Sequence, residues 1–224
     1  MRTLFIKALV MALTLSGCSS DAPEMPNPKV YLTRFSQLLK KPKVAAPVNI
    51  LGQISPELVA QLSTPTIAVK LQKSGAQALL AKTGDNRDTV TYATADNISL
   101  TLRNGIIIAS RGMAGDLMSS DISAFEPGIF RKWPPAYSRS YFWLNGVDHI
   151  TRETFSCTAL AIESKAITVL GSQKNTTHIR ESCNNDTTTI TNDYWLSPKL
   201  SVIITSNQWL GPVIGYMEVT SIKD

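Results

Sequence analysis

Cysteine carries the clearest chemistry in this sequence, and the first of its three cysteines lies near the start. An apolar run that begins behind Arg2 ends in the segment Leu15-Ser16-Gly17-Cys18. A positive segment, a short apolar run and small residues are typical of a secretory signal peptide, and the run is too short to span a membrane. An aliphatic residue and two small residues before cysteine form the bacterial lipobox pattern. The pattern predicts that residues 1–17 are removed and that a diacylglycerol alkylates the Cys18 thiol.

Lipidation of Cys18 would attach the protein to a membrane lipid surface. Each buried methylene contributes about 0.8 kcal/mol, so two or three acyl chains hold the anchor far longer than one. Ser19 follows the cysteine, whereas Asp at that place is the usual signal for retention in the inner membrane. We therefore expect a bacterial outer-membrane anchor with the domain facing the periplasm. The alternative is an ordinary exported protein in which Cys18 is unmodified.

The other two cysteines, Cys157 and Cys183, lie far from the signal segment. Two thiols in an exported chain favour one disulfide, which would close a loop of about 27 residues and stabilise the fold by about 3–4 kcal/mol. Two free buried cysteines are the alternative. A redox role is not indicated, because the sequence contains no Cys-x-x-Cys motif.

Histidine and carboxylate patterns give no catalytic or metal site. The chain has only His149 and His178, no serine in a Gly-x-Ser-x-Gly turn, and no paired histidines at metal-binding spacing. A glycosidase needs two carboxylates that flank a sugar ring. Candidates exist, but nothing in the sequence brings them together: Asp116, Asp121 and Glu153. We predict no catalytic residue, no metal and no cofactor.

Aromatic residues gather in the second half of the chain, and most of them are expected to fill a core. Trp133 and Tyr137 differ, because they lie on a segment interrupted by Pro127, Pro134 and Pro135 that reads as a loop. Loop side chains are needed less often for packing. These two aromatics are therefore the predicted contacts for a glycan or a partner protein.

The elements that must position these residues read as β-strands. Short runs rich in β-branched residues recur at a spacing of about 8–14 residues with turn residues between them, which favours an antiparallel meander, curled or barrel-like. Asn104-Gly105 fits a type I′ hairpin turn, with Leu102 facing Ile107 across the strands. The expected strands after residue 140 include YFWL, TFSCTALAI, AITVLG, TTHIRES, TTTITNDYWL, LSVIITSNQWL and GYMEVTSI.

A few short helices are expected near the N-terminus and in the middle of the chain. Residues 30–39 have near-helical apolar spacing, and Ser55-Pro56 is typical of a helix start. Residues 112–120 are expected to form a loop that leads into one helical turn. Residues 18–28 contain three prolines and read as an extended spacer, so residues 29–224 are predicted to form a single β-rich domain.

Composition limits the partners of that domain. Removing 17 of the 224 residues leaves 207, enough for one domain with a real core. Two of the 22 basic residues lie in the signal segment, so 20 basic residues remain against 17 acidic ones, a net charge of about +3. The basic residues are scattered, and nucleic-acid binding has no support.

Several distinctive motifs follow one another along the chain. The C-terminal third contains NDYWL, SNQWLGP and GY, ending at Tyr216, and residues 88–122 contain a hairpin followed by Gly-Asp-Leu. In this order, the motifs resemble those of the YjbF/GfcB-type lipoproteins of exopolysaccharide and group 4 capsule operons. Phe155-x-Cys157 and Glu181-x-Cys183 also fit the family. The resemblance implies an antiparallel β fold and a periplasm-facing outer-membrane lipoprotein that helps to produce or export an acidic surface polysaccharide. It implies a large outer-membrane export barrel and a periplasmic protein of the same operon as partners, with the polysaccharide itself as a further candidate, and it supplies no catalytic residues.

The leading hypothesis is a lipid-tethered binding or assembly factor, because a tether raises the local concentration for partners at the membrane. The first alternative is a lipid or lipoprotein carrier whose apolar concave face would include Leu100, Leu102 and Ile107. A groove of a few hundred Å³ would favour this carrier, whereas an interior filled by side chains would count against it. The second alternative is a polysaccharide-modifying enzyme.

Overall fold

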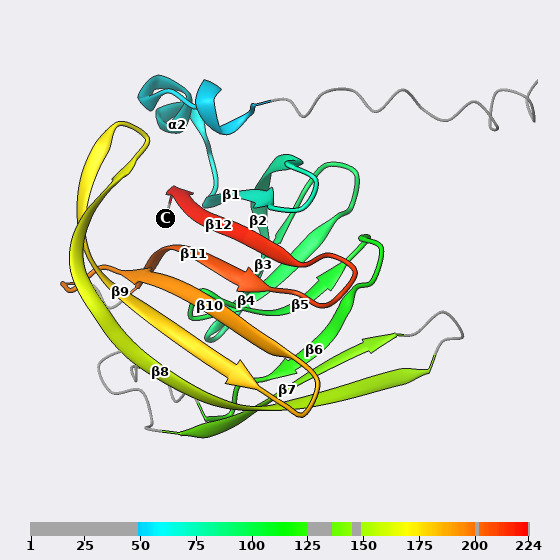
Figure 1. Ribbon diagram of the computed structural model, residues 1–224. Coiled ribbons are helices and arrows are strands. Elements are labelled where there is room, and N and C mark those ends of the chain that lie inside the picture. Colours follow the sequence, from blue (N-terminus) through cyan, green and yellow to red (C-terminus); the bar gives the residue numbers. More distant parts are fainter. Residues whose placement is uncertain (1–48, 125–135, 145–148, 200–201, 224) are drawn as a thin grey trace, which may run out of the picture. The chain divides into compact units, whose positions relative to one another are not determined.

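The computed structural model describes residues 49–124, 136–144, 149–199 and 202–223, all within one compact unit (Figure 1). The signal segment, the spacer, the expected helix at residues 30–39, Cys18 and Trp133 lie outside these residues. Within them, no helix is long and apolar enough to cross a membrane.

The described unit contains two short helices followed by strands. The helices are η1 (Leu51–Gln53) and α2 (Pro56–Gln61). The first strands are β1 (Thr66–Leu71), β2 (Gln77–Asn86), β3 (Thr89–Ala93), β4 (Ser99–Arg103), β5 (Ile106–Arg111) and β6 (Leu117–Asp121). The remaining strands are β7 (Tyr137–Leu144), β8 (Ile150–Val169), β9 (Ser172–Asn184), β10 (Thr189–Leu196), β11 (Ile203–Trp209) and β12 (Tyr216–Lys223).

The strands form one antiparallel sheet that is nearly closed into a barrel, which confirms the predicted meander (Figure 1). Its order is β5-β4-β3-β2-β1-β12-β11-β10-β9-β8-β7-β6. Neighbours in space are therefore neighbours in sequence except at one place, where β1 pairs with β12. The two ends of the sheet, β5 and β6, meet through side chains: the Ser110 hydroxyl accepts a hydrogen bond from Leu117 N at 2.9 Å, and Arg111 donates to the Leu117 carbonyl at 3.0 Å.

Two local predictions are confirmed. Asn104 and Gly105 have φ angles of 50° and 81° and join β4 to β5, with Leu102 opposite Ile107. Both angles lie in the left-handed region that a type I′ turn requires. At α2, the Ser55 hydroxyl accepts a hydrogen bond from Leu58 N at 3.3 Å, which satisfies one of the free N–H groups at the helix start.

The helical turn expected within residues 112–120 is wrong, because this segment is a tight turn followed by β6. The Asp116 carboxylate accepts hydrogen bonds from Gly112 N at 2.8 Å and Met113 N at 3.1 Å. These bonds fold the chain back on itself, as Asp side chains do in turns. Leu117 then enters the sheet fully buried, so the segment makes the corner at which the two sheet ends meet.

The interior is filled by side chains, and aromatic rings occupy much of it. Tyr141, Trp143, Phe155 and Trp209 pack against one another with ring centroids between 5.3 and 5.8 Å apart. Gln208 crosses this interior: its amide oxygen accepts from Ile107 N and its amide nitrogen donates to the Gly105 carbonyl, both at 2.9 Å. Gln208 of β11 is thus bonded directly to β5 and to the turn that precedes it.

Strand β8 is much longer than β7, one of its two neighbours in the sheet. β7 pairs with Ile150–Cys157 only, whereas β9 pairs with β8 as far as Val169. The segments TFSCTALAI and AITVLG, expected as separate strands, therefore belong to one strand of 20 residues, interrupted by a register shift between Ala161 and Glu163. Beyond Cys157, the β8–β9 hairpin curves away from the barrel as an arm (Figure 1). At its turn, Leu170 packs against a small apolar cluster that includes Ile54 and Ile222.

Candidate functional site

A buried polar network lies inside the barrel between β7, β9 and β10. The Glu181 carboxylate accepts hydrogen bonds from Arg139 Nη1 at 2.7 Å and from the Tyr137 hydroxyl at 2.7 Å. It also accepts from Asn192 Nδ2 at 2.6 Å and from the Tyr194 hydroxyl at 2.9 Å. Four donors therefore surround one carboxylate, two from the neighbouring strand β10 and two from β7, which β8 separates from β9.

Burial and charge act together on the titratable groups of this network. Burial raises the pKa of the Tyr137 and Tyr194 phenols, and the negative charge of Glu181 raises them further. Burial alone would lower the pKa of the Arg139 guanidinium, but the adjacent Glu181 carboxylate holds that pKa above its usual value. The phenols thus stay protonated and the guanidinium stays charged, which preserves every donor to Glu181 at neutral pH.

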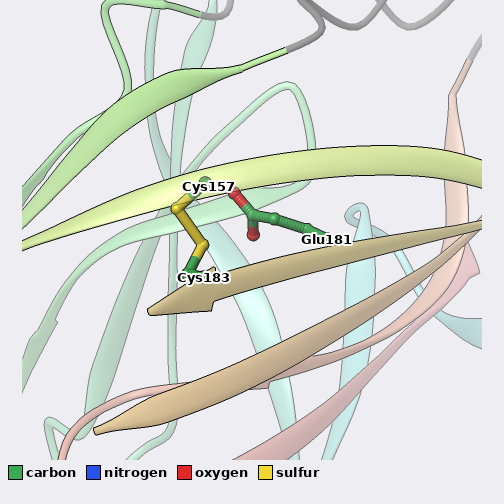
Figure 2. Close-up of side chains that lie close together, drawn as sticks. All are labelled: Cys157, Glu181 and Cys183. Carbon is green, nitrogen blue, oxygen red and sulfur yellow. A yellow bond between two sulfur atoms is a disulfide. The ribbon is translucent and has the colours of Figure 1, made fainter. Parts of the chain in front are cut away.

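Next to this network lies the disulfide between Cys157 and Cys183, which face each other on β8 and β9 (Figure 2). The two sulfur atoms and a Glu181 oxygen lie within 4.8 Å of one another, a spacing at which three ligands could hold a metal. A metal ion requires thiolates, however, and sulfurs joined to each other offer none. The Glu181 carboxylate is also occupied by its four donors. The chemistry of the three residues therefore fits a covalent cross-link beside an ion pair, not a metal centre.

The motifs that carry the family resemblance are built into this interior. Asn192 accepts a hydrogen bond from Trp209 N at 2.7 Å while donating to Glu181. The Trp143 indole N–H donates to the Leu210 carbonyl at 2.9 Å, and a Cβ on Gly211 would lie 2.6 Å from that same indole nitrogen. These residues therefore have packing and hydrogen-bonding roles that explain the motifs without a catalytic function.

The three residues expected to line a carrier groove are part of the packed core. Leu100, Leu102 and Ile107 are all buried in the main apolar cluster. A cavity of about 340 Å³ does open beside them, and its lining includes Leu102, Val90 and Val219. This cavity lies beside β3, β4 and β12.

A second recess lies on the outside of the sheet, beside the β8–β9 arm. The alternation along β10 directs Tyr194 into the barrel and places Asp193 and Trp195 on the outer face. The outer face of β10, β11 and β12 forms the floor of a groove of about 500 Å³, and the far half of β8 forms one wall. We call this recess the arm groove; its lining includes Gln72, Lys165, Ile167, Asp193, Trp195, Thr205, Asn207, Glu218 and Thr220.

Trp195 in the arm groove is held by a chain of polar contacts. Its indole stacks on the His178 ring, with centroids 4.7 Å apart and the ring planes 5° from parallel. His178 Nε2 lies 2.7 Å from Asp193 Oδ1, and Arg180 Nε donates to the same oxygen at 2.9 Å. Cross-strand pairing places His178 on β9 directly beside Trp195 on β10. The histidine that the sequence places on a strand face thus fixes the orientation of an aromatic ring.

Polar side chains with both donors and acceptors continue the floor across the sheet. Asp193 is opposite Asn207, and Asn207 is opposite Glu218. The Gln72 side-chain amide donates to Asn207 Oδ1 at 2.9 Å. In the next row, the Thr205 and Thr220 hydroxyls lie 2.7 Å apart. An aromatic ring beside amides, hydroxyls and carboxylates is a surface that can stack on one face of a ligand and bond to its edges.

The sequence-predicted contact residues have different outcomes. Tyr137 lies half-buried at the start of β7, with its hydroxyl directed inward to Glu181. Trp133 lies outside the described residues. The role of this pair as ligand contacts stays a prediction.

The three carboxylates considered for glycan cleavage are not brought together. Asp116 is engaged in the turn before β6, as described above. Asp121 pairs with Ser140, one residue before the inward-facing Tyr141, whereas Glu153 pairs with Tyr141 itself. Asp121 and Glu153 thus point to opposite faces of the sheet.

Comparisons with known proteins agree with the fold and its motifs. A family model described as "Group 4 capsule polysaccharide lipoprotein gfcB, YjbF" matches residues 49–222. Among solved structures, the hypothetical lipoprotein YmcC from Escherichia coli (K12) superposes with a TM-score of 0.67 at 17% identity, covering 87% of this chain and 95% of that chain. This likeness shows a shared fold. No curated protein matches significantly.

Proposed function

The chain belongs to the YjbF family of group 4 capsule polysaccharide lipoproteins, and on this premise we propose that it assists the production or export of a surface polysaccharide as a binding or assembly factor. The match over residues 49–222 is the observation that carries the proposal. The family description points to capsule polysaccharide as the process in which the protein takes part. The residues described above support a binding role in that process.

The proposed mechanism is concentration at a membrane surface. A diacylglycerol on Cys18 would anchor the β domain to the outer membrane on its periplasmic side, as the lipobox and Ser19 predict. Confinement to that surface raises the effective concentration of the domain for an outer-membrane export barrel and a periplasmic partner of the same operon. This increase in effective concentration needs no additional contact between the domain and its partners.

Binding is favoured over catalysis by the state of the buried polar groups. Arg139 and Glu181 are 1% and 0% exposed, and their hydrogen-bonding capacity is used by neighbouring side chains. A catalytic acid or base must reach its substrate within hydrogen-bond distance. The buried network therefore supports the role of a rigid scaffold, with binding at the outer surfaces of the domain.

The test compares two variants of the anchor in the native bacterium. Cys18→Ala removes lipidation, whereas Ser19→Asp keeps lipidation and introduces the inner-membrane retention residue. We expect both variants to lose surface polysaccharide, measured as polymer released from washed cells. Membrane fractionation would place the Ser19→Asp protein in the inner membrane and wild type in the outer membrane. Normal surface polymer in both variants, at wild-type protein levels, would contradict the proposal.

The cavity of about 340 Å³ favours one second candidate, a carrier of a small apolar group. Leu102, Val90 and Val219 offer an apolar surface that an acyl chain could contact. The charged side chains of Asp85, Arg87 and Asp88 also line this cavity. Mass spectrometry of lipid extracted from protein purified without detergent would test this role. A stoichiometric lipid bound to a Cys18→Ala protein would support the carrier, and lipid-free protein would exclude it.

A further inference from the structure

The geometry points to the arm groove as a binding site for a short uncharged stretch of polysaccharide, with Trp195 as the stacking platform. This inference rests on the proposed function and deepens it by naming a surface and a ligand class. The aromatic ring, the paired rows of polar side chains and the balance of charge each contribute to it.

Trp195 presents a ring whose orientation is already fixed. His178 covers one face of the indole, and Trp195 also lines the groove, so the opposite face is the one available to a ligand. The contacts from Asp193 to His178 and Arg180 restrain this stack before any ligand arrives. A preorganised aromatic face loses little conformational freedom on binding and suits the apolar face of a sugar ring.

The groove floor offers the bonding groups that sugar hydroxyls need. Asn207 and Gln72 supply amides that both donate and accept, and Glu218 supplies acceptor oxygens. Pairing between β11 and β12 sets Asn207 directly beside Glu218, so these groups form a row along the floor. A sugar edge carries neighbouring hydroxyls, each a donor and an acceptor, and such a row can bond to several of them at once.

The size of the groove suits more than a single small group. Its volume of about 500 Å³ lies within the range of about 300–1,000 Å³ typical of ligand sites. The arm supplies the wall through Lys165 and Ile167. The recess is bounded by the arm on one side and by the sheet face below, a shape that matches a chain lying along the strands.

Charge favours an uncharged stretch over an acidic one. The groove holds two carboxylates, Asp193 and Glu218, against one ammonium group, Lys165. Lys165 also lies 3.6 Å from the Glu163 carboxylate, and Asp193 is paired with Arg180. No excess of positive charge faces the ligand, so a carboxylate on the polymer would meet repulsion here.

The test uses short, size-fractionated fragments of the surface polysaccharide of the source bacterium. One portion keeps its carboxyl groups, and the other has them chemically reduced to uncharged hydroxymethyl groups. Binding to the purified domain is measured by calorimetry and by NMR shifts of the indole N–H groups. We expect the reduced fragments to bind more tightly than the acidic ones and to shift the Trp195 signal.

Matched variants assign the binding to the groove. Trp195→Ala should weaken binding of the reduced fragments by at least about fivefold, the loss expected for one stacking contact. Phe142→Ala removes another partly exposed ring, which lies on β7 outside the groove and is covered by Arg152 of β8, and should leave affinity unchanged. Asn207→Ala should also weaken binding and keeps the inference testable if the Trp195 variant is unstable.

Three outcomes would overturn the inference: no binding of either fragment set, equal binding by wild type and both groove variants, or tighter binding of the acidic fragments. These outcomes are separate from failure of the proposed function, which is read from surface polymer in the Cys18 and Ser19 variants. Absence of fragment binding together with anchor-dependent export would overturn this inference alone.

Discussion

Arg139 Nη1 lies 2.7 Å from Glu181 Oε2 in the interior of the barrel, with both side chains excluded from solvent. β8 separates the two strands that carry these residues, so the ion pair crosses one strand of the sheet. Each charge is compensated by the other and by neighbouring hydroxyl and amide groups. Substitutions at Arg139 and Glu181 can therefore show whether the polar groups of the interior are needed for stability or for a unique fold.

Loss of one partner should destabilise the domain more than loss of both. Glu181→Leu leaves the Arg139 guanidinium buried without its carboxylate, and breaking such a pair costs about 3–5 kcal/mol. The double variant Arg139→Met, Glu181→Leu removes both charges and should recover a large part of that loss. Urea unfolding of wild type, both single variants and the double variant measures the coupling. Additive losses would show that the two charges do not depend on each other.

Alkaline pH should destabilise the fold through its buried phenols. Burial first, and then the nearby Glu181 charge, raise the pKa of Tyr137 and Tyr194 above the ordinary value of 10.0. Because the folded pKa lies above the unfolded one, this contribution to stability is complete below pH 10 and decreases as pH rises further. The free energy of unfolding should fall above pH 10, and phenolate absorbance should rise together with loss of structure. Tyr137→Phe should make the fall shallower; phenolate formation in a still folded domain would contradict the assignment.

Removal of the disulfide should lower stability without abolishing the fold. The double variant Cys157→Ala, Cys183→Ala opens a loop whose ends are 26 residues apart, and the chain-entropy model gives a loss of about 3–4 kcal/mol. Reduction of wild type should cause a similar loss, measured by denaturant unfolding with and without reductant. The double variant serves as its own control, because reductant should leave it unchanged. Equal stability of wild type in both conditions would show that the bridge contributes little.

Two hairpin glycines offer a matched test of close packing. Gly105 and Gly171 have φ angles of +81° and +76°, so alanine is strained at both, by about 1–2 kcal/mol. A Cβ on Gly105 would also lie 2.9 Å from Ile203 Cβ, whereas nothing lies within 4 Å of a Cβ on Gly171. Gly105→Ala should therefore cost more than Gly171→Ala by about 1–3 kcal/mol in the free energy of unfolding. Equal losses would mean that Ile203 moves away freely.

Sequence patterns predicted the features that depend on short stretches of chain. The Asn104-Gly105 turn and the Ser55 cap follow from the backbone preferences of a few neighbouring residues. The prediction of a helical turn within residues 112–120 was wrong because the Asp116 side chain accepts hydrogen bonds from backbone N–H groups and closes a tight turn. A carboxylate that accepts two local N–H groups competes with helix formation, and composition alone does not decide that competition.

The two candidate sites could be predicted only in part. In TITNDYWL, the alternation of Ile190, Asn192, Tyr194 and Leu196 with the other residues would have placed Asp193 and Trp195 on the outer face. The arm groove itself depends on how far β8 extends past β7 and on the curvature of the arm. The ion pair joins residues 42 positions apart in sequence, and no local pattern connects them.

The pairing of β1 with β12 makes the order of synthesis matter. Thr66 at the start of β1 is opposite Lys223 at the end of β12. The first strand to be synthesised can therefore pair along its second edge only after the last strand has been made. Such a topology delays completion of the native sheet until the whole polypeptide is available. The final architecture can therefore be completed only once β12 has been synthesised, because only then can β1 pair along both of its edges.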